Sequence, residues 1–246
     1  MTDTVLVLGA RSDIGLAVAH RFAAAGHPVA LALRDAAGFE AARADIAIRH
    51  DVSVTLHDYD ALDTEALAGF VDSFEPAPGI VVCAVGTMGD QATSEADPAA
   101  AARVMRTNYE APALVLERFA ARMEAQGHGT LVGISSVAGD RGRAVNYVYG
   151  SAKAGFTAYL SGLRNRLSDT GVHVVTVKPG FVDTRMTEGM DLPGPLTARP
   201  EAVAEAIARA VARERSVVYV KPVWRAIMML IRAIPEPIFR RTRIGS

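Results

Sequence analysis

"VLVLGARSDIG", residues 5–15, joins a short apolar run to an amphipathic segment. The run at 5–8 is typical of a buried strand, and the pattern at 14–25 is typical of a helix. Gly9 and Gly15 suit a tight turn between them, where unpaired N–H groups and the positive end of the helix dipole can hold a phosphate. The stretch therefore predicts a strand, a phosphate-binding turn and a helix. A plain strand-to-helix turn is the alternative.

Asp13 is the unusual residue of this turn, because it stands where a third glycine would let the backbone approach an anion. We interpret Asp13 as the N-cap of the following helix, where its carboxylate accepts hydrogen bonds from backbone N–H groups of the first turn. Arg11 is close enough in sequence to offset the added negative charge.

Outward from this stretch, apolar runs alternate with amphipathic segments. The runs predict strands at 5–8, 29–33, 52–56, 80–85, 130–134, 172–177 and 217–220. The amphipathic segments predict helices at 14–25, 38–49, 63–72, 98–126, 147–169 and 201–213. Nearly continuous apolar strands separated by helices are typical of a parallel sheet covered on both faces. The sequence therefore predicts an α/β fold, a single-domain Rossmann-like doubly wound parallel sheet of about seven strands, with its ligand site at the carboxyl ends of the strands.

Composition limits the function classes. The chain has 246 residues, half of them hydrophobic, which is enough for one large domain. Its formal net charge of −1 gives no reason to expect a nucleic-acid partner. One cysteine, Cys83, excludes a disulfide framework and fits the reducing cytoplasm. We expect no secretory leader and, without paired cysteines or an HExxH motif, no metal site.

The end of the second predicted strand, "LALRD", bears on cofactor choice. In a dinucleotide fold, an acid at this point binds a ribose 2′-hydroxyl, whereas arginine accommodates a 2′-phosphate. Leu33 occupies the acidic position and offers no acceptor, while Arg34 and Arg11 offer two guanidinium groups suited to phosphate. This favours NADP. A small shift of register would make Asp35 the ribose acid and favour NAD.

"SSVAGDRGRAVNYVYGSAK", residues 135–153, carries the chemistry. Tyr149 and Lys153 are four residues apart on a predicted helix and so share one face. A nearby ammonium stabilises a phenolate and lowers the tyrosine pKa, which makes Tyr149 a usable proton donor and acceptor. Ser136, at the end of the fifth predicted strand, lies at the same edge of the sheet. Its hydroxyl could hydrogen-bond the oxygen of a reacting carbonyl.

With these motifs in this order along the sequence, the chain resembles the short-chain dehydrogenase/reductase family over residues 3–220. The family's glycine turn matches 9–15, and "CAVG" (83–86) replaces its usual Asn-Ala-Gly, keeping only the glycine. Asn108 in "MRTNYEAP" matches the family asparagine. "KPGFVDT" (178–184) matches its Pro-Gly segment around the nicotinamide.

The resemblance implies a role for each matched residue. Lys153 would also bind the nicotinamide ribose, Asn108 would order a proton-relay water, and Asp58 would lie near the adenine. The predicted catalytic residues are Asn108, Ser136, Tyr149 and Lys153. The predicted cofactor-binding residues are Gly9, Arg11, Ser12, Asp13, Ile14, Gly15, Arg34, Asp58, Ala84, Val85, Gly86, Tyr149, Lys153, Pro179, Gly180, Val182 and Thr184.

Two short segments resemble one particular group of reductases within this family. Asp13 before Ile-Gly, and "AVGTMGDQ" (84–91), are similar to the decaprenylphosphoryl-2-keto-ribose reductases, which reduce a keto-pentose on a polyprenyl phosphate.

The tail "KPVWRAIMMLIRAIPEPIFRRTRI" (221–244) combines apolar residues with six basic ones and a single acid. Its uncharged runs are too short to span a bilayer. Two interpretations stay open: a helix lying on the inner face of the membrane, or one packed on protein.

We expect an NADP-dependent oxidoreductase that reduces a ketone to a secondary alcohol. Its domain would cover 1–220, with a loop at 187–200 closing over substrate, followed by the tail at 221–246. By resemblance, helices 98–126 and 147–169 would form a dimer or tetramer interface. The substrate is a lipid-linked keto-sugar or a soluble ketone. A catalytically idle NADP-binding scaffold is the further alternative, less favoured because the Ser/Tyr/Lys set is complete.

Overall fold

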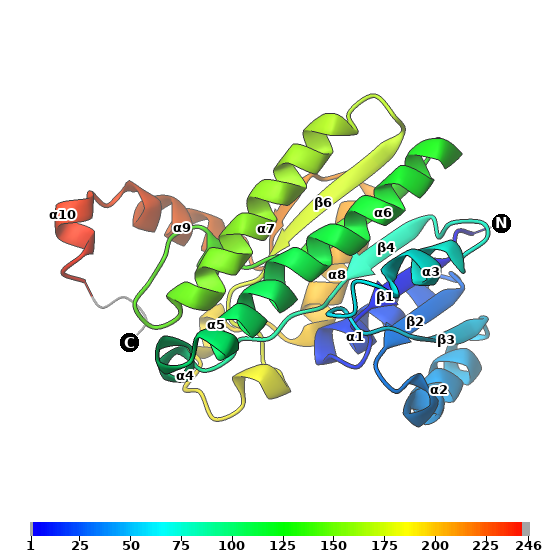
Figure 1. The fold of residues 1–246 in the computed structure, drawn as a ribbon, viewed down its shortest axis with the longest axis horizontal. Coiled ribbons are helices and arrows are strands. Elements are labelled where there is room, and N and C mark those ends of the chain that lie inside the picture. Colours follow the sequence, from blue (N-terminus) through cyan, green and yellow to red (C-terminus); the bar gives the residue numbers. More distant parts are fainter. Residues whose placement is uncertain (1, 243–246) are drawn as a thin grey trace.

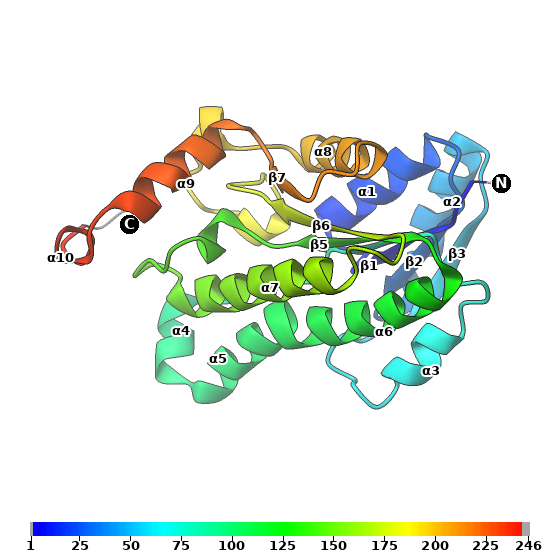
Figure 2. The same ribbon diagram turned by 90° about the horizontal axis from the view of Figure 1, so that it is seen from above.

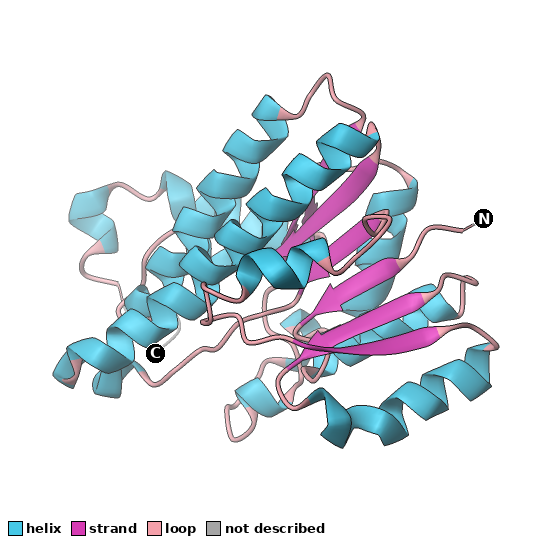
Figure 3. Cartoon of the chain, turned by 45° about the vertical axis from the view of Figure 1, so that its right-hand side comes forward, coloured by secondary structure: helices cyan, strands magenta, loops and turns pink. Residues whose placement is uncertain are grey.

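Seven parallel strands form one sheet in the order β3-β2-β1-β4-β5-β6-β7 in the computed structural model, which describes residues 2–242 (Figures 1 and 3). The strands are β1 (Val5–Leu8), β2 (Val29–Leu33), β3 (Val54–Asp58), β4 (Ile80–Cys83), β5 (Gly129–Ile134), β6 (Val172–Lys178) and β7 (Val217–Tyr219). The chain starts at the centre of the sheet, winds outward to β3, then returns to β4 and winds the other way. This confirms the predicted doubly wound fold and brings the carboxyl ends of β1 and β4 together at the reversal point.

Helices cover both faces of the sheet (Figure 2). They are α1 (Asp13–Ala23), α2 (Glu40–His50), α3 (Leu67–Asp72), α4 (Gln91–Ala96), α5 (Pro98–Met105), α6 (Ala111–Gln126), α7 (Tyr147–Arg166), α8 (Pro200–Ala212), α9 (Val223–Ala233) and α10 (Glu236–Phe239). On one face α1, α2 and α8 bury residues such as Phe22 and Ile207; on the other, α3, α6 and α7 bury residues such as Phe119 and Phe156. The inner strands β1, β2 and β4 are buried from both sides, which explains why their sequences are continuously apolar, whereas the edge strands β3 and β7 are partly exposed.

The predicted helix at 98–126 is interrupted. A π-helical turn at Arg106–Glu110 separates α5 from α6. Within it the Asn108 side chain donates to the carbonyl of Val104 at 2.9 Å, four residues earlier. A side chain that takes a backbone acceptor of the helix widens the turn locally. Such π turns are frequent at functional sites.

Other element boundaries also differ from prediction. The third strand lies at 54–58 instead of 52–56, and the predicted helix at 63–72 begins only at Leu67. Asp63 accepts a hydrogen bond from the Ala66 N–H at 3.0 Å, so its side chain stabilises a turn that competes with the start of the helix. The short helix α4 was not predicted.

The tail forms α9 and α10, which project from one end of the molecule (Figures 1 and 2). One face of α9 packs on the domain: Trp224 is 5% exposed and Met228 is 1% exposed. At its carboxyl end, Arg141 donates to the carbonyls of Ile231 and Arg232. Within residues 2–242, no helix combines the length and apolar character needed to cross a bilayer.

Candidate active site

A cavity of about 300 Å³ opens at the carboxyl ends of the strands. The predicted site residues that line it are Ser12, Asp13, Ile14, Ala84, Val85, Gly86, Asn108, Ser136, Tyr149, Lys153, Pro179, Gly180, Val182 and Thr184. Gly9 and Gly15 form the turn beneath its wall, while Arg11, Arg34 and Asp58 lie outside the lining. Segments more than a hundred residues apart therefore meet at one edge of the sheet, as the parallel topology requires.

The glycine turn is built by close backbone approach. Gly9 has a φ of +82°, and a side chain there would lie 3.0 Å from the carbonyl group of Ala84. The N-cap of α1 is Ser12, whose Oγ accepts from the Gly15 N–H at 3.0 Å and donates to the Gly9 carbonyl at 2.8 Å. The assignment of Asp13 as N-cap is therefore wrong. Ser12 takes this role because its shorter side chain stands one residue earlier, where the backbone is still extended.

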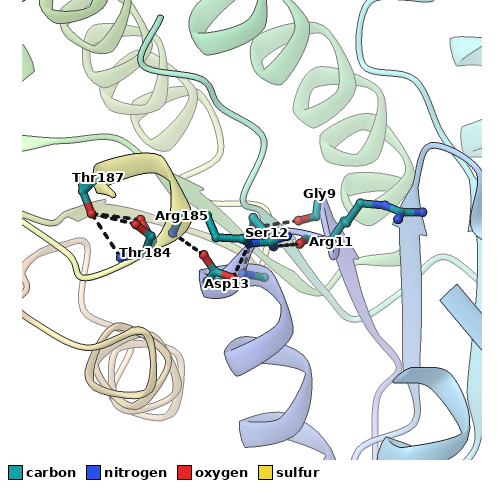
Figure 4. Close-up of polar contacts among 8 residues, drawn as sticks. Gly9, Arg11, Ser12, Asp13, Thr184, Arg185 and Thr187 are labelled. Carbon is teal, nitrogen blue, oxygen red and sulfur yellow. Dashed lines mark hydrogen bonds and ion pairs between the residues drawn. The ribbon is translucent and has the colours of Figure 1, made fainter. Parts of the chain in front are cut away.

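Asp13 instead joins the glycine turn to the segment after β6 (Figure 4). Its carboxylate accepts from the backbone N–H of Arg185 at 2.8 Å and from the Arg185 Nε at 2.9 Å. The Arg185 Nη2 also donates to the carbonyl of Arg11 at 2.6 Å. The prediction that Arg11 offsets the Asp13 charge is wrong, because Arg185 does so from 172 residues further along the chain.

Arg11 points toward β2. Its Nη2 donates to the carbonyls of Arg34 and Asp35 at 3.1 and 2.9 Å, and it lies 3.8 Å from the Asp35 Oδ2. Asp58 accepts from the Ala36 N–H at 2.8 Å and so holds the turn that follows β2. The predicted cofactor-selecting residues thus gather at the carboxyl end of β2, with Arg34 exposed to solvent.

Ser136, Tyr149 and Lys153 line one side of the cavity, which we call the catalytic wall. Lys153 is 3% exposed, and its Nζ donates to the carbonyl of Ile134 at 3.0 Å. This ammonium lies 5.8 Å from the centre of the Tyr149 ring. The Ser136 Oγ accepts from the Ala138 N–H at 3.1 Å, which fixes the hydroxyl at the end of β5.

Burial sets the proton affinities of the catalytic wall. It raises the pKa of the Tyr149 hydroxyl, with the Ser136 hydroxyl acting in the opposite direction. It also lowers the pKa of the Lys153 ammonium to about 8. The expected lowering of the Tyr149 pKa is not borne out: desolvation of the phenolate raises it, and the Lys153 ammonium, hydrogen-bonded to the Ile134 carbonyl, is not among the groups that shift it. Tyr149 is therefore held in its protonated form.

Asn108 is fully buried and ties α5 to the segment after β4. Its Nδ2 donates to the Thr87 carbonyl at 2.6 Å, and its Oδ1 accepts from the Thr87 N–H at 3.3 Å. A side chain at Gly86 would lie 3.0 Å from this Oδ1 and 3.5 Å from the Lys153 Nζ. The "CAVG" segment keeps its glycine for this reason, although Cys83 and the two residues after it depart from the family pattern.

A second group of lining residues, which we call the outer wall, was missed by sequence reasoning. It consists of Phe181, Met186, Met190 and Trp224. The Trp224 Nε1 donates to the Leu196 carbonyl at 3.1 Å, so α9 holds the 187–200 loop in place. No local pattern marks these residues, because they meet only through tertiary packing.

The residues present fit a dinucleotide. The N–H groups of Asp13 and Ile14 lie in the first turn of α1, where an α-helix provides no acceptor for them, and both residues line the cavity. The Asp13 carboxylate is compensated by Arg185, so it does not leave an uncancelled negative charge at a phosphate position. The catalytic wall lines the same cavity.

The short chain dehydrogenase family model matches residues 3–192. The chain belongs to the short-chain dehydrogenase family. An uncharacterized oxidoreductase of Mycobacterium tuberculosis is 42% identical over 248 aligned residues, covering 98% of this chain and 99% of the relative. The sulfoacetaldehyde reductase of Chromohalobacter salexigens is 30% identical over 191 residues, covering 76% of this chain and 75% of the relative.

The same fold occurs in a solved short-chain dehydrogenase from Sphingobium yanoikuyae in complex with NADPH. It has a TM-score of 0.83 and 24% identity, with 99% of this chain and 98% of the other covered. As a short-chain dehydrogenase with a complete catalytic wall, the chain is an NAD(P)-dependent oxidoreductase.

Proposed function

We propose that this short-chain dehydrogenase uses NADPH to reduce a ketone to a secondary alcohol. One observation carries the proposal: the catalytic wall and the first turn of α1 line the same cavity. The fold neighbour from Sphingobium yanoikuyae, with its NADPH, supports the same cofactor.

NADPH, when bound, supplies a hydride to the carbonyl carbon. Tyr149, protonated because burial raises its pKa, gives its proton to the carbonyl oxygen, so that hydride and proton together make the alcohol. Ser136 holds that oxygen by hydrogen bonding. Lys153 uses one N–H on the Ile134 carbonyl and has two more for ribose hydroxyls. In this proposal Asn108 positions the segment after β4, and it orders the relay water.

The preference for NADPH over NADH rests on the end of β2. Arg11 is oriented there by the carbonyls of Arg34 and Asp35, and the Arg34 side chain is exposed beside it. Two guanidinium groups suit a 2′-phosphate, whereas no carboxylate in this turn is free of a cationic neighbour, since Asp35 lies 3.8 Å from Arg11.

For the substrate, we propose a ketone carried on a lipid phosphate, such as a polyprenyl-phosphate-linked keto-sugar. The outward face of α9 and α10 supports this: Met229, Leu230 and Ile238 are 65%, 67% and 58% exposed. Arg225 and Arg232 are exposed on the same helix. Apolar side chains flanked by arginines suit an anionic membrane surface, which would bring the cavity close to the lipid. A soluble ketone remains the second candidate, because the outer wall is apolar whichever substrate enters.

A cytoplasmic homo-oligomer is the further part of the proposal. Met105, Tyr109 and Leu114 are each more than 40% exposed along α5 and α6, the helices expected at the interface. Burying such side chains against a second copy would favour association.

The test is reduction of a panel of ketones by the purified protein, followed by NADPH consumption, together with sedimentation on anionic liposomes. Replacing both Met229 and Leu230 by serine should abolish sedimentation, while Ile48→Ser, at an 84% exposed site on α2, should not. Absence of NADPH-dependent reduction across the panel would refute the enzymatic proposal. Failure of the intact protein to sediment at low salt would leave the soluble ketone as substrate.

A further inference from the structure

Arg143 is a cationic group inside the cavity that has no partner in the part of the chain that the structure describes. It lies on the segment between Ser136 and Tyr149, and it lines the cavity with them. Its Nε is enclosed, yet no hydrogen-bond acceptor for it is found among residues 2–242. Burial lowers the pKa of this guanidinium, but arginine remains charged in proteins. Enclosing a charged donor without a partner costs stability, so a partner from outside the chain is expected.

The charged residues next to Arg143 on this segment, Asp140 and Arg141, both have partners within the chain. Asp140, the third residue before Arg143, accepts from Lys178 at 2.5 Å and from the Tyr219 hydroxyl at 2.8 Å. Arg141 donates to the carbonyls at the end of α9 and to Glu236 at 2.8 Å. Both contacts anchor the segment to β6, β7 and the tail. Arg143 is therefore held toward the cavity by fixed neighbours.

The cavity offers Arg143 no counter-charge of its own. Among the described residues that line it, Asp13 is the one acid, and Arg185 already binds it through two hydrogen bonds. The Asn146 Oδ1, three residues after Arg143, is likewise enclosed without a partner. A donor and an acceptor that both line the cavity thus have no hydrogen-bond partner among the described residues.

We propose that Arg143 is a specificity-determining residue that binds an oxyanion of the substrate, a carboxylate or a phosphate. The substrate is then an amphipathic acid: its apolar part packs on the outer wall and its anionic group meets the guanidinium. The planar guanidinium can bind either oxyanion through two parallel hydrogen bonds. The Asn146 Oδ1 accepts a hydrogen bond from a substrate hydroxyl. This inference rests on the proposed ketone reduction, since it names the class of ketone.

Binding of unreactive probes to the full-length protein with NADPH tests the inference by calorimetry. The probes are straight-chain carboxylates from butanoate to decanoate, the corresponding amides, and alkyl phosphates of matching length. The carboxylate or the phosphate should bind about tenfold to hundredfold more tightly than the amide. Arg143→Gln should remove this preference, Arg143→Lys should retain part of it, and Arg213→Gln, at an exposed site beyond α8, should retain all of it.

Each outcome is decisive. Equal binding of carboxylates, phosphates and amides at every length, or a preference for either oxyanion that survives in Arg143→Gln, overturns the inference. A preference confined to phosphates assigns the site to a phosphate ester, and one confined to carboxylates assigns it to a keto acid. Folding of each variant is checked by thermal unfolding and NADPH binding. Because the probes are not reduced, an Arg143-dependent preference without ketone turnover would refute only the proposed function, and turnover without that preference would refute only this inference.

Discussion

The catalytic wall and the outer wall of the cavity differ in how they are held. Lys153 and Ser136 are fixed by hydrogen bonds to backbone groups at the end of β5, within the buried centre of the fold. The outer wall is fixed by packing between peripheral segments: the ring centres of Phe181 and Trp224 are 5.5 Å apart, and the Trp224 Nε1 donates to the Leu196 carbonyl in the 187–200 loop. The reacting groups are thus part of the sheet's own construction, whereas the space for the substrate is shaped by peripheral segments.

This difference separates two kinds of substitution. A change in the catalytic wall should remove chemistry and leave the fold intact, because its side chains add to a backbone framework that the strands already support. A change in the outer wall should alter both substrate affinity and local stability, since Trp224 fills the space between α9 and the 187–200 loop. The following tests exploit that contrast.

The largest effect is expected in the catalytic wall. Tyr149→Phe removes only the hydroxyl, so turnover should fall by about two to four orders of magnitude. NADPH affinity and thermal unfolding should stay close to those of the unchanged protein, and they are the controls. Near-normal reduction of a confirmed substrate by this variant would show that another group donates the proton.

The matching change in the outer wall is Trp224→Ala. Trp224 is 5% exposed, and truncating a buried tryptophan costs about 3–5 kcal/mol of unfolding free energy. The KM for ketone should rise more than the dissociation constant of NADPH. Urea unfolding and steady-state kinetics measure both, with Ile238→Ala on the exposed side of α10 as the control. Unchanged stability would mean that the tail does not support the cavity.

A smaller effect is expected at the carboxyl end of β2, where Arg34 tests the choice of cofactor. If Arg34 binds a 2′-phosphate, Arg34→Ala should weaken NADPH binding by about 1–3 kcal/mol while leaving NADH binding unchanged. Fluorescence titration with both nucleotides measures this difference. Equal losses for the two nucleotides, or tighter binding of NADH by the unchanged protein, would assign the position to Asp35 and to NAD.

The smallest effect is expected for the rate of reduction, which should change little with pH. Reduction needs protonated Tyr149, and burial raises its pKa above the ordinary value of 10.0, so its ionisation should not limit reduction below that pH. Oxidation of the alcohol needs the ionised form and should rise about tenfold per pH unit over the same range. Initial rates in both directions between pH 6 and 9 check the contrast. A fall in reduction near neutral pH that is absent from Tyr149→Phe would show that the tyrosine ionises there.

The catalytic wall could be predicted from sequence because its geometry is local. The ends of parallel strands share one edge of the sheet, so Ser136 after β5 had to lie near the glycine turn after β1. Tyr149 and Lys153 are one helical turn apart, which places both side chains on one face of α7. Strand periodicity, helix spacing and topology together were enough to bring these residues into one cavity.

The remaining contacts depend on distances that no local pattern encodes. Arg185 reaches Asp13 across 172 positions, and Arg141 reaches Ile231 near the end of α9 across 90. The direction of the Tyr149 pKa shift also depended on burial, which spacing alone does not reveal. One stripe of the tail is buried and packs on the domain, as expected for a helix packed on protein, and another stripe is exposed. Residues 243–246 of the predicted tail lie outside the described part of the chain.

Trp224 and Met228 form, with Val137, a hydrophobic cluster separate from the two that cover the faces of the sheet. Substitutions at well-separated positions change stability nearly independently. The stability cost of a change in this small cluster is therefore nearly independent of which residues fill the main core. Descendants of such a chain can exchange α9 and the residues around Phe181 for others, and so acquire new substrates, while inheriting the same sheet and the same proton donor.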